Sequence, residues 1–187
     1  MKREPSRSTS GNPPAACRGE DVNSGGLYEP GETIMSRYVW YFAYGSNMDS
    51  TRMKDRIDGW EARVPGVLRG WKLVFNKVAS KNPQEGFANI VPAEGDVVEG
   101  CLYLVSAEAL DTLDVCEAAP DHYERREVAV ERRDTGEVVT ATAYVAQPDK
   151  VKEGLQPARR YLDHLLAGGD CLSEEYVRRL RATETLD

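Results

Sequence analysis

Apolar and aromatic side chains recur at strand-like spacing through most of the chain after residue 36. The clearest run is Tyr-Val-Trp-Tyr-Phe-Ala-Tyr at 38–44, which predicts a strand because aromatic and β-branched residues favour extended backbone. The same pattern predicts further strands at 64–78, 87–91, 97–105, 123–132 and 137–146. The last two flank Asp134-Thr135-Gly136, which is typical of a hairpin turn.

Three segments instead show helical spacing and helix-terminal residues: 107–117, 157–167 and 174–183. Ser106 and Ser173 suit N-caps, Pro157 suits a first helical turn, and Gly168-Gly169 suits a helix end. Many strands with few helices predict an α+β fold, in which a mixed, mostly antiparallel, barrel-like sheet is flanked by a few helices.

Residues 1–36 lack any periodic apolar pattern and are rich in Ser, Gly, Pro, Arg and Glu, which predicts a disordered tail before a folded domain at 37–187. A biological extension, a cloning remnant and a start codon placed upstream of Met35 remain alternatives. Lys2 and Arg3 are followed by no apolar segment of the kind found in signal peptides, and no apolar run is long enough to span a membrane. We therefore expect a cytoplasmic protein with no membrane partner.

Composition narrows the partners further. The formal net charge of −7 disfavours nucleic-acid binding, because no basic stripe is available for phosphate contacts. The cysteines and histidines show no zinc-ligand spacing, so we expect no metal; they are Cys17, Cys101, Cys116, Cys171, His122 and His164. Reduced thiols are the default expectation for a cytoplasmic protein, with a disulfide as the alternative. The oligomeric state stays open, with a homodimer as one alternative.

The first apolar run stops abruptly at Gly45-Ser46-Asn47. Gly45 and Asn47 tolerate positive φ, which predicts a sharp turn at these two residues. Asp49 to Thr51 offers N-caps for a short helix through Met53 and Ile57. A strand, a small-residue loop and a helix start together present a row of backbone N–H groups that suits an anion, although a plain strand-to-helix turn fits the same pattern.

A carboxylate falls on the apolar face of the helix predicted at 107–117. Leu110, Leu113 and Glu117 lie at i, i+3 and i+7, so Glu117 is expected to point toward the interior or into a pocket. A carboxylate in such a position suits a general base that then acts as a general acid. The alternative is a Glu that reaches solvent or forms an ion pair with Arg125 or Arg126. A nucleophilic Ser46 served by His122 or His164 is a weaker hypothesis, because Ser46 is not in a Gly-x-Ser-x-Gly elbow.

Taken in order, the motifs resemble the γ-glutamylcyclotransferase family, also described as AIG2-like or butirosin-type cyclotransferase-like. The resemblance covers roughly 37–183 and is carried by Phe-Ala-Tyr-Gly-Ser-Asn-Met at 42–48, Phe-Ala-Asn-Ile at 87–90, Val-Glu-Gly-Cys-Leu-Tyr at 98–103, Leu-Asp-Val-Cys-Glu at 113–117, Tyr123, Tyr-Val-Ala at 144–146, Pro-Ala-Arg-Arg-Tyr at 157–161 and Leu-Ser-Glu-Glu-Tyr at 172–176.

This resemblance implies a barrel-like α+β fold and a cofactor-independent enzyme that converts a γ-glutamyl amide to 5-oxoproline and a free amine. It implies that Glu117 is the acid/base residue and that the substrate is bound by Tyr44, Gly45, Ser46, Asn47, Met48, Asp49 and Tyr161. Two alternatives stay open: a non-catalytic ligand-binding or interaction protein on the same scaffold, and an amide hydrolase that uses Ser46.

Two departures from the family pattern leave the substrate unassigned. A Gly commonly follows the family's catalytic Glu, whereas this chain has Ala118, and the loop ends in Met48-Asp49 where some cyclotransferases carry two apolar residues. γ-Glutamyl amino acids, γ-glutamyl amines and γ-glutamyl-protected intermediates all remain candidate substrates. Glutathione is less expected, because glutathione-specific relatives carry a different loop.

Overall fold

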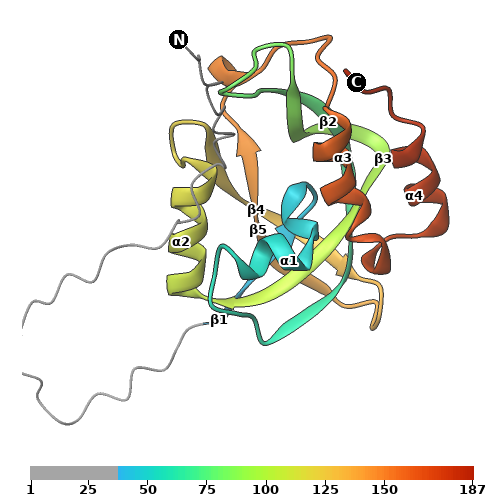
Figure 1. Cartoon of the computed structure of the whole chain (residues 1–187). Coiled ribbons are helices and arrows are strands. Elements are labelled where there is room, and N and C mark those ends of the chain that lie inside the picture. The colour runs from blue at the N-terminus through green and yellow to red at the C-terminus, as the bar shows by residue number, and fades with distance from the viewer. Residues whose placement is uncertain (1–37) are drawn as a thin grey trace, which may run out of the picture.

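The structure, a computed structural model, describes residues 38–187, so the tail predicted at 1–36 lies outside the described residues. Within that range five strands close into a barrel in the order β1-β3-β2-β4-β5, with helices packed around it (Figure 1). The strands are β1 (Tyr38–Ala43), β2 (Ala62–Val78), β3 (Gly86–Ser106), β4 (Tyr123–Arg132) and β5 (Val138–Ala146). The α-helices are α1 (Ser50–Lys54), α2 (Ala107–Glu117), α3 (Arg159–Leu166) and α4 (Glu174–Arg181), and the 3-10 turns are η1 (Ser46–Met48), η2 (Pro148–Lys150) and η3 (Gly169–Cys171).

The barrel is closed by the first and last strands. β1 pairs with β5 in parallel, with Trp40 opposite Ala141, while every other strand pair is antiparallel. This arrangement confirms the predicted mixed, mostly antiparallel barrel. Closure also removes the free strand edges that would otherwise be open to pairing with another chain.

One long strand replaces two predicted short ones. The segments predicted at 87–91 and 97–105 were expected to be separate, but both belong to β3. Pairing with β2 skips four residues at this point: Arg69 lies opposite Val97 and Trp71 opposite Pro92. The polar stretch at 93–96 that suggested a break is therefore a bulge, at which both long strands bend without ending.

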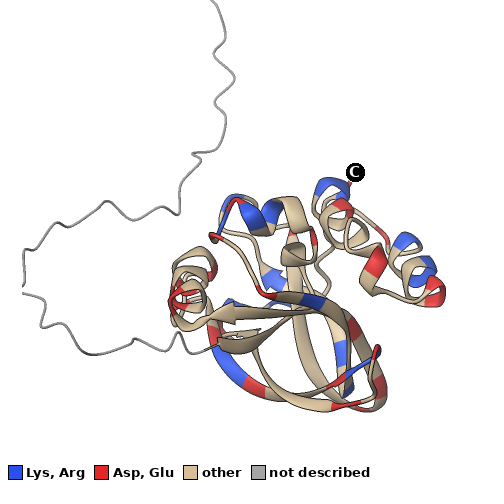
Figure 2. Ribbon diagram, turned by 90° about the horizontal axis from the view of Figure 1, so that it is seen from below, with Lys and Arg blue, Asp and Glu red and all other residues tan. Residues whose placement is uncertain are grey.

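The helices gather at one end of the barrel, where α1 and η1 lie between α2 on one side and α3 on the other (Figure 1). The predicted helix at 107–117 is confirmed residue for residue, with Ser106 as its cap. The helices at 157–167 and 174–183 are shorter than predicted, and α1 ends at Lys54, before Ile57. Acidic and basic residues are interspersed over barrel and helices (Figure 2). Among 38–187 no helix is long and apolar enough to cross a membrane, and no cluster suits a metal ion.

Candidate active site

The loop after β1 turns through η1, and not through the positive φ angles that the sequence suggested. Gly45 has φ −117° and ψ −144°, and Asn47 lies within the 3-10 turn. The amides of Met48 and Asp49 donate to the carbonyls of Gly45 and Ser46, which closes the turn. Gly45 is needed for space instead. A Cβ there would lie 3.2 Å from Ala88 Cβ and 3.3 Å from the Tyr161 hydroxyl, closer than ordinary contacts.

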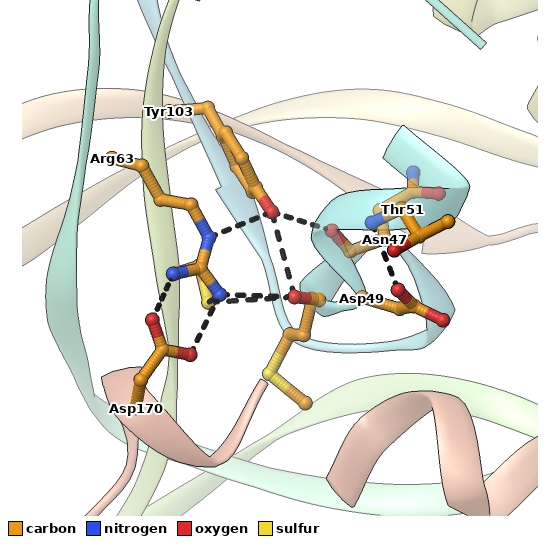
Figure 3. Close-up of polar contacts among 8 residues, drawn as sticks. Asn47, Asp49, Thr51, Arg63, Tyr103 and Asp170 are labelled. Atoms are coloured by element: carbon orange, nitrogen blue, oxygen red, sulfur yellow. Dashed lines mark hydrogen bonds and ion pairs between the residues drawn. The ribbon is translucent and has the colours of Figure 1, made fainter. Parts of the chain in front are cut away.

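Buried polar groups hold this loop from the barrel side (Figure 3). The Tyr103 hydroxyl donates to the carbonyl of Asn47 at 3.0 Å, and Arg63 donates to the carbonyl of Met48 at 3.1 Å. Arg63 is itself fixed by an ion pair with Asp170 and by a hydrogen bond to Tyr103. Hydrogen bonds to both carbonyls fix the direction of the loop backbone, so its N–H groups are preorganised.

Asp49 anchors the far end of the loop. Its carboxylate accepts from the amide of Thr51 (Figure 3) and from that of Arg52, which makes it the N-cap of α1 as the sequence predicted. The other carboxylate oxygen lies 2.8 Å from Nδ1 of His164 on α3. Burial raises the pKa of Asp49, but these hydrogen bonds outweigh it, and the net pKa lies below its ordinary value. Asp49 therefore joins α1 to α3.

Glu117 ends α2 with its side chain only 17% exposed, as expected from its place beside Leu110 and Leu113. Its Oε1 accepts from Arg56 Nη1 at 2.6 Å and from Asn47 Nδ2 at 3.1 Å. Both contacts are to one oxygen, which leaves Oε2 without a hydrogen bond to any described residue. The carboxylate is thus anchored by one oxygen and available through the other.

The basic partner of Glu117 differs from the two that the sequence offered. Arg125 pairs with Asp111 and Asp114, and Arg126 pairs with Glu124, so neither reaches Glu117. Both lie on β4, which leads away from the end of α2, whereas Arg56 follows α1 beside the loop. Burial lowers the pKa of Arg56, but the negative charge of Glu117 raises it, and the net pKa lies above its ordinary value. Arg56 therefore stays charged beside the carboxylate.

Glu117 and the loop enclose a small pocket, which we call the inner pocket, with about 310 Å³ of empty space. Its wall consists of loop residues, one carboxylate and several tyrosines: Tyr41, Tyr44, Gly45, Ser46, Asn47, Ala88, Glu117, Tyr123, Tyr144 and Tyr161.

Two tyrosine hydroxyls of the inner pocket already donate within the protein, Tyr44 to the carbonyl of Tyr144 and Tyr123 to the carbonyl of Ala88. Tyr161 accepts a hydrogen bond from the amide of Ala88 at 3.0 Å, so its own proton is available to a ligand. Burial raises the pKa of Tyr161 to about 12. Burial also raises the pKa of Tyr44 and Tyr123 well above the ordinary value. The inner pocket therefore offers the neutral Tyr161 hydroxyl as a donor and one negative charge, at Glu117.

A second cavity, which we call the outer pocket, adjoins the first and holds about 680 Å³ of empty space. Ser46, Glu117, Tyr123 and Tyr161 line both. The rest of its wall is more basic and consists of Arg52, Arg56, Lys77, Ser80, Phe87, Cys116, Ala118 and His122. Here the Ser46 hydroxyl accepts from Arg52 Nε at 3.2 Å.

The structure brings most of the predicted site residues together. Tyr44, Gly45, Ser46, Asn47, Glu117 and Tyr161 all line the inner pocket, whereas Met48 is fully buried in the core and Asp49 caps α1. Sequence reasoning did not single out Arg52, Arg56 and Lys77, which line the outer pocket. Their only signal was a charge near the loop or in a strand, which is also typical of a solvated surface.

Comparisons with known proteins identify the family and the fold. The family model described as "Gamma-glutamyl cyclotransferase, AIG2-like" matches residues 41–163. A search of curated proteins finds no match. A solved structure of a γ-glutamyl cyclotransferase is 26% identical with a TM-score of 0.72, over 81% of this chain and 90% of that one.

Two other solved structures extend the picture. An uncharacterized protein from Homo sapiens is 26% identical with a TM-score of 0.70, over 80% of this chain and 90% of that one. A γ-glutamyl cyclotransferase specific to glutathione from yeast has a TM-score of 0.58 over 76% of this chain and 93% of that one, but at 14% identity it shares only the fold. Since the family model covers more than half of the sequence, the chain belongs to the AIG2-like γ-glutamyl cyclotransferase family.

Proposed function

We propose that this protein is an enzyme that converts a γ-glutamyl amide to 5-oxoproline and a free amine. The observation that carries the proposal is the state of Glu117: a largely buried carboxylate, anchored through Oε1 by Arg56 and Asn47, with Oε2 available at the inner pocket. Such a carboxylate is positioned for proton transfer. Family membership agrees with this chemistry.

The inner pocket suits the γ-glutamyl half of the substrate. Gly45 and Ser46 line the pocket, and their backbone N–H groups have no acceptor within the described part of the chain, so they are available to the substrate's carboxylate and to a developing oxyanion. Asn47 Oδ1 is buried without a hydrogen-bond partner in that range. A buried acceptor is costly unless a donor satisfies it, and the substrate's α-ammonium is such a donor.

The reaction needs few protein groups. The α-nitrogen attacks the γ-carbonyl carbon, a new C–N bond closes a five-membered ring, and the bond to the leaving nitrogen breaks. Overall two protons move from the α-ammonium to the leaving amine, and no water is consumed. Glu117 Oε2 accepts a proton from the α-nitrogen and later delivers one to the leaving nitrogen. Well-oriented intramolecular reactions reach effective molarities of about 10⁵–10⁸ M. Holding the α-nitrogen close to the γ-carbonyl carbon therefore accounts for much of the rate enhancement.

The two alternatives fit the site less well. A hydrolase needs a base beside Ser46, but the Ser46 hydroxyl contacts only the donor Arg52 among residues 38–187. His164 is held by Asp49, and His122 contacts Lys77. The non-catalytic alternative predicts an exposed, ion-paired Glu117. The ion pair is present, but the side chain is largely buried and directed to a pocket.

The test is Glu117→Gln, assayed for 5-oxoproline with the full chain and a panel of γ-glutamyl amides. Turnover should fall about 10²–10⁴-fold, the usual contribution of a positioned acid/base residue. Glu108→Gln is the matched control, because Glu108 is exposed in the first turn of the same helix and should keep wild-type turnover.

Three outcomes would contradict the proposal in different ways. A fully active Glu117→Gln variant would overturn the acid/base assignment. Release of glutamate in place of 5-oxoproline would favour the hydrolase. A folded wild-type protein that turns over no γ-glutamyl amide would favour a non-catalytic binding protein.

A further inference from the structure

The wall of the outer pocket carries more positive than negative side chains. Over barrel and helices the two signs are interspersed (Figure 2). In the wall of the outer pocket three cationic side chains, Arg52, Arg56 and Lys77, face a single carboxylate, that of Glu117. Arg56 is engaged by Glu117, which leaves the positive charges of Arg52 and Lys77 to be explained.

Lys77 is nearly buried but forms no ion pair. The residue is only 3% exposed, and no carboxylate among residues 38–187 pairs with its ammonium group. Nζ lies 2.9 Å from His122 Nδ1, and 5.6 Å from the ring centroids of both Phe87 and Tyr123. Burial lowers the pKa of His122, and the charge of Lys77 lowers it further, so the imidazole is a neutral acceptor. Lysines are rarely buried without a countercharge, so this arrangement suits a ligand anion.

Arg52, on α1, is a second cation of the outer pocket without a countercharge among the described residues. Its guanidinium donates through Nε to Ser46 and has no ion pair within the described range. Burial, and then the neighbouring charge of Arg56, lower the pKa of Arg52. A guanidinium carries five N–H donors in a planar fork that matches a carboxylate, and only one of them is used here. Two cations from different elements, α1 and β2, therefore line the same cavity without a carboxylate of their own.

The connection between the two pockets says which part of a substrate the cations would meet. Glu117, Ser46 and Tyr161 line both cavities, so the reacting amide belongs at their junction. With the γ-glutamyl group in the inner pocket, the group attached to the amide nitrogen extends into the outer one. The outer pocket is also the larger, at about 680 Å³ against about 310 Å³.

We propose that the outer pocket binds the leaving half of the substrate and selects an anionic one, an amine that carries a carboxylate, through Arg52 and Lys77. This inference rests on the proposed function and deepens it, because it chooses among γ-glutamyl amides by the charge of the leaving group. A neutral amine would leave both cations without a counterion. A leaving group with two carboxylates would meet both cations.

The experiment compares substrates that differ only in the leaving group: γ-glutamylalanine, its neutral analogue γ-glutamylalaninamide, and γ-glutamylglutamate. The full-length protein should prefer γ-glutamylalanine over the amide roughly 10- to 100-fold in kcat/KM, the usual effect of a hydrogen bond to a charged group. γ-Glutamylglutamate should be at least as good as γ-glutamylalanine. Lys77→Met, which keeps the length of the side chain, and Arg52→Gln should each reduce the ratio between γ-glutamylalanine and its amide.

Lys72→Met is the matched control, because Lys72 is exposed on the same strand as Lys77. This substitution also removes one positive charge. It should leave the ratio unchanged. Lys77→Arg keeps the charge and should retain a preference for the carboxylate, which separates loss of charge from loss of fold.

The outcomes distinguish this inference from the proposed function. Equal production of 5-oxoproline from γ-glutamylalanine and its amide would overturn the inference and leave the proposed function intact. If neither substrate yields 5-oxoproline, the proposed function fails, and calorimetric binding of the same two compounds decides the inference. Tighter binding of the carboxylate that is lost in Lys77→Met would support an anion-selective pocket. Equal binding, or none, would overturn it.

Discussion

The inner and outer pockets share Glu117 but differ in how they are built. The inner pocket is lined by tyrosines and by a loop whose backbone carbonyls accept hydrogen bonds from Tyr103 and Arg63 on the barrel. The outer pocket is walled by long cationic side chains, two of which lack a countercharge within the described residues. Fixed hydrogen bonds recognise a group by its shape, whereas unpaired charges recognise it by its sign.

This difference suggests a division of labour within one active site. The γ-glutamyl group is the same in every candidate substrate, so a pocket with preorganised donors can be matched to it closely. Leaving groups vary in size, and a roomier pocket with two cations accepts several of them provided that they carry negative charge. Changes to the inner pocket should therefore affect all substrates alike, and changes to the outer pocket should affect the ratio between them.

The largest expected effect beyond Glu117 itself comes from Asn47, which binds both Glu117 and Tyr41. Asn47→Ala removes the amide that orients the carboxylate, and we expect kcat to fall about 10²-fold, as when one preorganised donor is lost. Ser46→Ala removes a hydroxyl but no backbone donor, so kcat should fall less in this variant than in Asn47→Ala. Turnover of γ-glutamylalanine and γ-glutamylalaninamide should fall equally in Asn47→Ala. A loss confined to the anionic substrate would break the division between the pockets.

A smaller effect, about tenfold at most, should appear in the pH dependence of the outer pocket. Burial lowers the pKa of Lys77 below its usual 10.5; Glu117 opposes this shift and Lys150 adds to it. A lowered pKa means that the ammonium loses its proton at lower pH than an exposed lysine would. The preference for γ-glutamylalanine over its amide should therefore fall as the pH rises through that pKa.

The ratio separates Lys77 from groups that act on both substrates alike. The α-ammonium is common to both substrates and cancels. The pKa of His122 is lowered, so this imidazole is already neutral, and those of Tyr123 and Tyr161 are raised beyond the range of interest. Lys77→Arg should keep the preference to higher pH, because arginine stays charged. A wild-type ratio that stays flat up to pH 10.5, the usual pKa of a lysine, would show that Lys77 does not bind the leaving group.

How far the sequence predicts this molecule depends on whether a feature is local. The cap at Ser106 and the spacing of Leu110, Leu113 and Glu117 are local, and they placed the carboxylate on the buried face of α2 correctly. The partner of Glu117 is not local: Arg56 lies 61 residues earlier and meets Glu117 only once the barrel has closed. Sequence alone therefore identified the carboxylate, and it raised an ion pair as an alternative, but the two arginines that it offered as examples were not the partner.

The same distinction explains the other gaps. Lys77 looks like an ordinary strand lysine, because its burial follows from the packing of Tyr123 and His122 against it. The bulge at 93–96 looks like a strand end, because only pairing with β2 shows that the strand continues. Gly45 was correctly placed in the loop for the wrong reason, since its small size, and not its φ angle, is what the neighbouring Tyr161 requires.

The smallest expected effect concerns Ala118, which lines the outer pocket directly after Glu117 and stands where family members commonly have Gly. Its φ of 50° and ψ of 48° are left-handed, a conformation that costs a non-glycine residue about 1–2 kcal/mol. Glycine also increases the conformational entropy of the unfolded chain, which lowers stability by about 0.4–1 kcal/mol. The relief of strain outweighs this loss, so Ala118→Gly should raise the free energy of unfolding by roughly 0.5–1 kcal/mol. Urea unfolding measures this change in the free energy of unfolding.

Ala119→Gly is the control, because Ala118 is the only non-glycine residue with positive φ among 38–187, and relief of strain is therefore not available at 119. Ala119→Gly should destabilise the protein. If Ala118→Gly destabilises it equally, the turn that places Glu117 between the two pockets is not strained, and the departure from the family's Gly carries no cost in stability.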